Sequence, residues 1–283
     1  MESFWTKVAL RIWVALILLF LFIPILLIFF YAFNTSNIES WPIPGLTFKW
    51  FTATWNDPEI RTALGLSVQA GLAATALSLV LGSCAAFAIH RMTFFGRDAI
   101  SLLFVLPLAL PGIITGIALN AFFSFGAVRL SFWTIVVGHT TFCIVVVYNN
   151  VLARLRRSQG SLIEAAMDLG ASGFQTFRDI TLPLISTSVV AGAMLAFALS
   201  FDEIIVTNFT SGSEITLPKW IFNNLRLPNQ RPVVNVVASV LLLVSLIPVY
   251  IAQRLTQESG GLVSGRGAVV PAIEDSVEQP AVP

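Results

Sequence analysis

Charged residues are scarce in this sequence. Asp, Glu, Lys and Arg make up 11% of its 283 residues, whereas soluble globular domains contain about 25%. None of its three lysines lies in a GxxxxGK(S/T) segment, so the chain has no phosphate-binding loop with which to bind ATP. The net charge of +1 gives no indication of nucleic-acid binding. The only two cysteines, Cys84 and Cys143, both lie in apolar runs, which argues against a disulfide framework and predicts two buried thiols.

Long apolar runs are abundant instead. Hydrophobic residues make up 56% of the chain, and six segments each provide the roughly 20 apolar residues that a helix needs to cross a bilayer. We therefore predict an all-α membrane protein with transmembrane helices at about 9–33, 64–90, 99–123, 131–153, 184–209 and 233–254. The third contains Pro107, Pro111 and Gly112, so we expect it to be kinked. Lys7 and Arg11 precede the first run, but it has no small-residue cleavage site and is interpreted as a retained helix.

The distribution of lysine and arginine between the loops predicts the orientation, because cytoplasmic loops carry an excess of both. With a cytoplasmic N-terminus, ten cationic residues face the cytoplasm: Lys7, Arg11, Arg91, Arg97, Arg154, Arg156, Arg157, Arg178, Arg254 and Arg266. Six then face outward: Lys49, Arg61, Arg129, Lys219, Arg226 and Arg231. We therefore expect a multi-pass membrane protein with both termini in the cytoplasm. Residues 1–255 would form the transmembrane domain, and 256–283, rich in Gly, Ser, Pro, Val and Glu, a disordered cytoplasmic tail.

The loop at 34–63 lies on the outer side in this topology. It carries Trp41, Trp50 and Trp55. Indole rings favour the level of the lipid headgroups, so we expect this loop to contact membrane lipid, as an aromatic belt or as a helix along the surface. Docking of a partner protein is the alternative interpretation.

A polar passage interrupts the apolar sequence at 154–183, between the fourth and fifth predicted spans. Ser161 followed by Glu164 has the spacing of a capping box and predicts the start of a helix. Gly170 is suited to end that helix, because a left-handed C-terminal residue costs glycine little. Ser172 and Gln175 repeat the capping-box spacing, which predicts a second short helix. The passage is therefore expected to form two short cytoplasmic helices with a glycine corner.

Small, apolar and charged side chains share this predicted element. An exposed surface of this kind is typical of a helix that docks in the groove of another protein, and it is also compatible with an amphipathic loop resting on the lipid headgroups. Composition alone leaves both interpretations open. The residues that we expect at the surface are Glu164, Ala165, Ala166, Asp168, Leu169, Gly170 and Phe174.

The same passage resembles a family signature. EAA at 164–166, Gly170, Ile180 and LP at 182–183 are similar to the EAA loop of the membrane subunits of binding-protein-dependent ABC importers. The resemblance covers roughly residues 9–254 and implies the fold of a type I importer permease, with six transmembrane helices and a coupling helix between helices four and five. It favours docking: the coupling helix would sit in a groove of an ATP-hydrolysing subunit.

The resemblance also implies a place in the bacterial plasma (inner) membrane, and partners. Two ATP-binding subunits would hold the ATP and Mg, so that this chain itself needs no cofactor and is a transport subunit and not an enzyme. A second, homologous permease subunit would complete the path, as a heterodimer in preference to a pair of identical chains. An extracytoplasmic binding protein would deliver the substrate.

Two shorter stretches, LSFDEIIVTNFTSG at 199–212 and TLP at 216–218, resemble the spermidine/putrescine branch of this family. They imply a polyamine substrate. A permease for another small solute, such as an opine, an aminophosphonate or ferric iron, is the alternative within the same class. A secondary transporter driven by ion gradients is a rival from another class, but it would leave the EAA pattern without a role.

Asp202 and Glu203 are the only acidic residues inside the six predicted spans. Counted from Leu184, Asp202 lies about 27 Å along the fifth helix, in the outer half of the bilayer. Charged groups at such a depth are costly, so they are candidates for a substrate path. Carboxylates beside the aromatic rings of Phe197 and Phe201 would suit a polycation. Solvation of both acids in the outer headgroup region is the alternative.

Three further polar residues bear on the predicted path and its surroundings. Asn208 follows the two acids and is a further candidate for lining the substrate path. His139, in the fourth span, is interpreted as a hydrogen-bonded packing residue, with a proton relay or ligand as the alternative. His90 ends the second span beside an arginine. The two histidines have no cysteine or carboxylate at ligand spacing, so we expect no metal site, and no residue pattern predicts a catalytic site.

Overall fold

The computed structural model describes residues 4–39, 41–92, 95–158, 160–227 and 230–264. These residues are almost entirely helical, and the β-bridge recorded among them joins Asn34 to Leu46. The elements are α1 (Phe4–Ala32), α2 (Lys49–Asn56), α3 (Pro58–Arg91), α4 (Arg97–Ala109), α5 (Gly112–Phe125), α6 (Phe132–Arg157), α7 (Gly160–Asp168), α8 (Gly173–Thr176), the π-helix η1 (Phe177–Thr181), α9 (Leu182–Phe201), α10 (Ile205–Thr210), α11 (Leu217–Asn224) and α12 (Arg231–Ser264).

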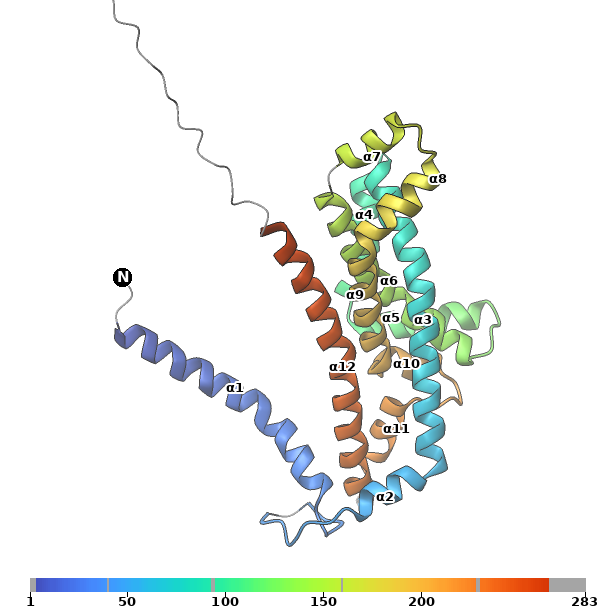
Figure 1. The fold of residues 1–283 in the computed structure, drawn as a ribbon. Coiled ribbons are helices and arrows are strands. Elements are labelled where there is room, and N and C mark those ends of the chain that lie inside the picture. The colour runs from blue at the N-terminus through green and yellow to red at the C-terminus, as the bar shows by residue number, and fades with distance from the viewer. Residues whose placement is uncertain (1–3, 40, 93–94, 159, 228–229, 265–283) are drawn as a thin grey trace, which may run out of the picture.

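The predicted all-α membrane fold is confirmed. Within the described residues, five helical stretches are long and apolar enough to cross a membrane, and the bent pair α4 and α5 makes a sixth if it counts as one span. Helices α3, α6 and α9 pack together at the centre, and α12 lies against α9 (Figure 1). Their shared core includes Val147, Tyr148 and Ile185. A Cβ added at Gly82 on α3 would lie 3.1 Å from the side chain of Val147 on α6. The two helices therefore approach closely at this glycine.

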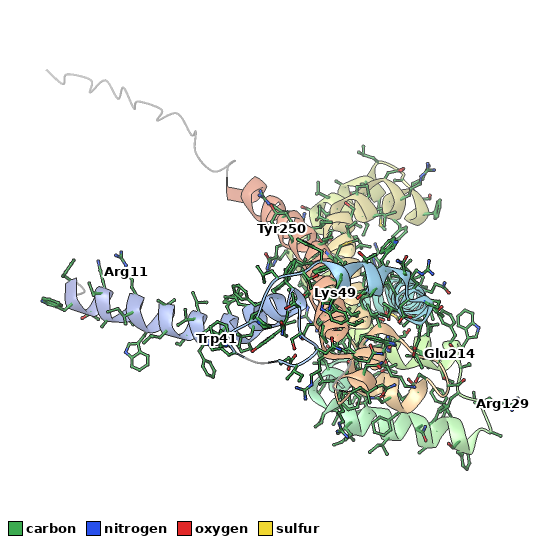
Figure 2. The ribbon with its side chains drawn as sticks, turned by 90° about the horizontal axis from the view of Figure 1, so that it is seen from below. Arg11, Trp41, Lys49, Arg129, Glu214 and Tyr250 are labelled. Carbon is green, nitrogen blue, oxygen red and sulfur yellow. The ribbon has the colours of Figure 1, made fainter. Side chains whose placement is uncertain are left out.

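Helix α1 stands apart from this bundle. It contacts α12, and the only one of its residues that is buried is Ala32 at its end. Figure 2 shows α1 extending away from one side of the bundle, opposite the loop that carries Arg129. An all-round apolar surface of this kind is stable only against lipid or another membrane chain.

The third predicted span is not a single kinked helix. Helices α4 and α5 meet at an angle of 104°, because Leu110 is extended (φ −79°, ψ 143°) and Pro111 follows it. Proline disfavours the helical conformation of the preceding residue and donates no N–H of its own. The expected kink is therefore a complete break.

The remaining spans differ from the prediction mainly at their ends. Helix α3 begins at Pro58 and not near residue 64, because the Asp57 carboxylate caps it by accepting from Glu59 N at 2.8 Å. Helix α12 continues to Ser264, so the tail predicted from residue 256 is helical at its start. A helix already nucleated in the span gains one hydrogen bond for each residue it adds. The rest of that tail, 265–283, lies outside the described residues.

The Asp57 cap gives a stability prediction. Asp57→Ala removes the acceptor for the first N–H groups of α3 and should lower the free energy of unfolding by about 1 kcal/mol. Asp57→Asn keeps an acceptor and should restore most of it. The measurement is the thermal unfolding midpoint of the purified protein in detergent. Equal midpoints for wild type and Asp57→Ala would contradict the capping role.

The loop 34–48 and α2 are tied to the bundle. The Trp50 indole N–H donates to Asn34 O at 2.7 Å, and Lys49 Nζ lies 4.4 Å from the Trp50 ring centroid. At the other side of the loop, Asn235 Nδ2 on α12 donates to a Glu39 carboxylate oxygen at 2.9 Å. A short helix, α2, forms within the predicted loop. Trp41 remains exposed, as a residue at the headgroup level would be.

Candidate functional site

The polar passage between α6 and α9 forms the corner that the sequence predicts. Gly170 has a φ of +85°, its N–H donates to Met167 O at 2.9 Å, and Ala171 N–H donates to Ala166 O at 3.0 Å. These are the two bonds of a Schellman motif, which a left-handed glycine closes. Gly170 is confirmed as the residue that ends α7.

The second capping box is confirmed and the first is not. Ser172 Oγ accepts from Gln175 N at 3.3 Å, and Gln175 Oε1 accepts from Ser172 N at 2.8 Å. Helix α7, by contrast, begins at Gly160. Ser161 therefore lies inside its first turn instead of capping it.

An exposed apolar tip surrounds the glycine corner. The side chains of Leu169 and Phe174 are 89% and 72% exposed. Ala165 beside them is exposed and Ala166 is partly covered, so another backbone could approach closely. Exposed leucine and phenylalanine at the end of a bundle indicate an interaction surface. Helices α7 and α8 stand at one end of the molecule, far from α2 and α11 at the other (Figure 1).

The corner is joined rigidly to the bundle. The second predicted helix is not separate from the fifth span: α8, η1 and α9 form one continuous stretch from Gly173 to Phe201. The π-turn arises because Pro183 has no N–H and its ring would clash with the carbonyl four residues earlier. Phe177 in η1 packs edge-on against Phe87 of α3, with centroids 5.5 Å apart. Arg154 Nε of α6 donates to Leu184 O at 2.9 Å.

The second candidate region is a break in the predicted fifth span. Helix α9 ends at Phe201, and α10 does not begin until Ile205, so the span predicted to reach residue 209 is wrong beyond 201. The Asp202 side chain is exposed at the break. Glu203 is partly covered, and its Oε1 accepts from Val206 N at 2.9 Å. The Glu203 carboxylate therefore binds a backbone N–H in the first turn of α10, so it is less available than Asp202 for contact with a substrate.

The aromatic residues predicted beside these acids lie in different surroundings. Phe197 and Phe201 are stacked, with centroids 5.6 Å apart, but Phe201 is only 1% exposed and does not line an open surface. It packs inward because α9 turns that face toward the core. Phe197 is partly covered and contacts Gly71 of α3. Asn208 on α10 is exposed.

Polar side chains from α5 and α6 hold both ends of α10, and the sequence predicted a hydrogen-bonding role only for His139 among them. Asn120 Nδ2 donates to Phe209 O and Thr134 Oγ1 donates to Thr210 O, each at 2.6 Å. His139 lies between Ser200 Oγ, at 2.7 Å, and Thr207 Oγ1, at 2.8 Å. The interpretation of His139 as a hydrogen-bonded packing residue is confirmed. Each backbone group left unpaired in a bilayer costs several kcal/mol, so the bonds to the carbonyls of Phe209 and Thr210 stabilise the C-terminal end of α10.

Comparison with known proteins identifies the family of this chain. Residues 78–258 match the family described as "Binding-protein-dependent transport system inner membrane component". The chain belongs to this family. It is thus a transport component and a multi-pass protein of the inner membrane.

Relatives of this permease are similar over most of their length. This chain is 34% identical over 242 residues to the spermidine/putrescine transport system permease protein PotC of Escherichia coli K12, and the match covers 84% of this chain and 90% of PotC. PotC of Haemophilus influenzae is 32% identical over 242 residues, with 85% and 93% covered. The putrescine transport system permease protein PotI of Escherichia coli K12 is 32% identical over 253 residues, with 84% and 89% covered.

Solved importers share the fold of this permease at lower identity. A bacterial alginate ABC transporter, solved with its alginate-bound periplasmic protein, gives a TM-score of 0.66 at 14% identity and covers 91% of this chain and 98% of that one. The MetNI methionine ABC transporter gives a TM-score of 0.55 at 17% identity, covering 72% and 99%. These structures support the predicted fold class.

Helix α11 carries a partly buried lysine, Lys219, whose contacts the sequence did not predict. Lys219 Nζ donates to Ser211 Oγ at 2.7 Å, to Gly212 O at 3.1 Å and to Glu214 O at 3.0 Å. Burial lowers the pKa of this ammonium group, and the nearby Glu214 carboxylate partly opposes the shift. Lys219 thereby holds the loop between α10 and α11.

The remaining reactive residues are structural or lipid-facing. Both cysteines are free, but only Cys143 is buried, with its thiol donating to Ala196 O at 3.2 Å. Cys84 is exposed, so the expectation of two buried thiols is wrong for it; its face of α3 is one that lipid can cover. Among the described residues, no group of three or more His, Cys, Asp or Glu side chains could hold a metal ion.

Proposed function

We propose that this permease forms the translocation path of an ABC importer for polyamines such as spermidine and putrescine. The observation that carries the proposal is the similarity, over 84% of the chain, to permeases of spermidine/putrescine and putrescine transport systems. The exposed carboxylate at the α9–α10 break agrees with a cationic substrate.

The exposed tip around Gly170 is the proposed coupling element. Leu169 and Phe174 supply apolar contact, Ala165 and Ala166 allow close approach, and Glu164 and Asp168 form a charged rim. These features suit a groove on an ATP-binding subunit. The continuous stretch from α8 to α9 would carry motion of the docked subunit to the break at Asp202. Two such subunits would bind the ATP and Mg, and this chain would contribute no cofactor site.

Further partners complete the proposed importer. A second, homologous permease would enclose the path together with this chain, and an extracytoplasmic binding protein would deliver the substrate at the end that carries α2 and α11. In this orientation α7 and α8 are cytoplasmic, as are both termini, in agreement with the distribution of lysine and arginine. Membrane lipid would surround the exposed apolar faces of the spans.

ATP hydrolysis by the intact complex tests the proposal. The complex that co-purifies with the tagged chain is placed in lipid nanodiscs with its binding protein, with and without spermidine. We expect ATPase activity that rises on addition of spermidine. Activity that ignores spermidine but responds to another solute would retain the importer and overturn the polyamine substrate. Uptake that persists after ATP depletion would instead favour a secondary transporter.

A further inference from the structure

The break between α9 and α10 is held by a chain of hydrogen bonds that centres on one histidine. His139 is 1% exposed, and its ring spans the gap between the last turn of α9 and the first turn of α10. Nδ1 lies 2.7 Å from Ser200 Oγ, and Nε2 lies 2.8 Å from Thr207 Oγ1. The Thr207 hydroxyl in turn reaches Glu203 O at 2.7 Å.

The direction of these bonds follows from counting protons. Thr207 has a single hydroxyl proton, which it donates to Glu203 O, since a carbonyl can only accept. The Thr207 oxygen must therefore accept the hydrogen bond from His139, so His139 Nε2 carries a proton. In the neutral imidazole Nδ1 is then the acceptor, and Ser200 is its donor. The result is a one-way chain from Ser200 through His139 and Thr207 to the Glu203 carbonyl.

The chain ends directly beside the exposed Asp202. Residues 202–204 belong to neither helix, because α9 ends at Phe201 and α10 begins at Ile205. Four hydrogen bonds hold the corner: Asp202 N–H donates to Ala198 O, Asn208 N–H to Ile204 O, Val206 N–H to the Glu203 carboxylate, and the Thr207 hydroxyl, which ends the His139 chain, to Glu203 O. Of these, only the His139 chain connects the corner to α6, a helix of the central bundle.

We propose that His139 is a positioning residue of the substrate path: it fixes the corner at 202–204 so that the Asp202 carboxylate faces the passing polyamine. This inference rests on the proposed function of Asp202 as a residue of that path. His139 itself does not touch the substrate, because it is buried among α6, α9 and α10. The alternative is that His139 only fills space in the core, in which case any side chain of similar shape would support transport equally well.

The test separates these roles with a cysteine reporter. The intact complex carries Asp202→Cys together with Cys84→Ser, because Cys84 is exposed. The readout is the rate at which a cationic, membrane-impermeant thiosulfonate labels position 202. Three further substitutions are compared in this background. His139→Phe keeps a ring but removes both bonds, His139→Gln keeps a donor and an acceptor, and Thr140→Val removes a hydroxyl that bonds only within its own helix, to Val136 O.

We expect His139→Phe to change the labelling rate about fivefold, since the reactivity of a thiol follows its surroundings and exposure. His139→Gln and Thr140→Val should stay within about twofold of the parent. In the otherwise unmodified complex, His139→Phe should reduce spermidine uptake about tenfold, the effect of losing bonds of this kind at a transport step. Its ATPase activity without substrate should persist, because the coupling element is untouched.

Unchanged labelling in His139→Phe would overturn the proposal. If His139→Phe does not assemble, Thr207→Val replaces it: it keeps the shape but removes the hydroxyl that links His139 to Glu203, and equal labelling there would equally contradict the positioning role. Failure of the proposed function looks different. If His139→Phe alters the labelling rate but Asp202→Asn takes up spermidine normally, His139 does position the corner and Asp202 is not part of the substrate path.

Discussion

Gly170→Val should strongly reduce coupled transport while leaving the protein inserted in the membrane. At a φ of +85° a β-branched side chain costs about 1–2 kcal/mol or more, since Cβ approaches the neighbouring carbonyl. The corner can escape this strain only by unwinding the two Schellman bonds at Met167 and Ala166, which would displace Leu169 and Phe174 together. Spermidine uptake should then fall about tenfold or more, because each 1.4 kcal/mol of docking energy is a factor of ten.

The matched control for this prediction is Gly173→Ala, three residues further along the same element. Gly173 has no positive φ, and a Cβ there would meet nothing within 4 Å, so uptake should remain normal. The measurement has two parts: uptake in proteoliposomes, and the amount of ATP-binding subunit that co-purifies with the tagged chain. Normal co-purification and uptake in Gly170→Val would remove the coupling role from the corner.

Local signals in the sequence explain why this corner could be predicted. Gly170 and the Ser172–Gln175 box act through backbone groups within a few residues of themselves, so their effect does not depend on the rest of the fold. The number and type of the spans are predictable for a similar reason, since apolar length is a requirement of the bilayer. The family signature at 164–183 added the role of the corner, which composition alone left open.

The breaks in the spans were harder to predict because hydropathy does not register them. Residues 205–210 include Ile205, Val206 and Phe209, so the apolar run continues through them although α9 ends at Phe201. His139, Thr134 and Asn120 lie between 61 and 89 residues away in sequence from the groups of α9 and α10 that they bind. Their role becomes visible only once the helices are placed side by side.

The two candidate acids show the same limit. They are adjacent and equally charged, so the sequence treats them as near equivalents. In the structure Glu203 turns back to accept from Val206 N, while Asp202 remains exposed. The carboxylate bound to the backbone stabilises α10, which leaves Asp202 as the stronger candidate for contact with the substrate.

Asp202→Asn should reduce spermidine uptake by about tenfold, because a hydrogen bond to a charged group contributes about 1.5–3 kcal/mol and the neutral amide loses much of this. The shape of the side chain and the corner are retained, so assembly with the ATP-binding subunits and ATPase activity without substrate should be unchanged. Glu59→Gln is the control: Glu59 is an exposed acid at the start of α3, and its loss should leave uptake as it is. The measurement is uptake at saturating binding protein, so that delivery of spermidine does not limit the rate. Equal uptake in Asp202→Asn and wild type would mean that Asp202 is simply solvated near the outer headgroups.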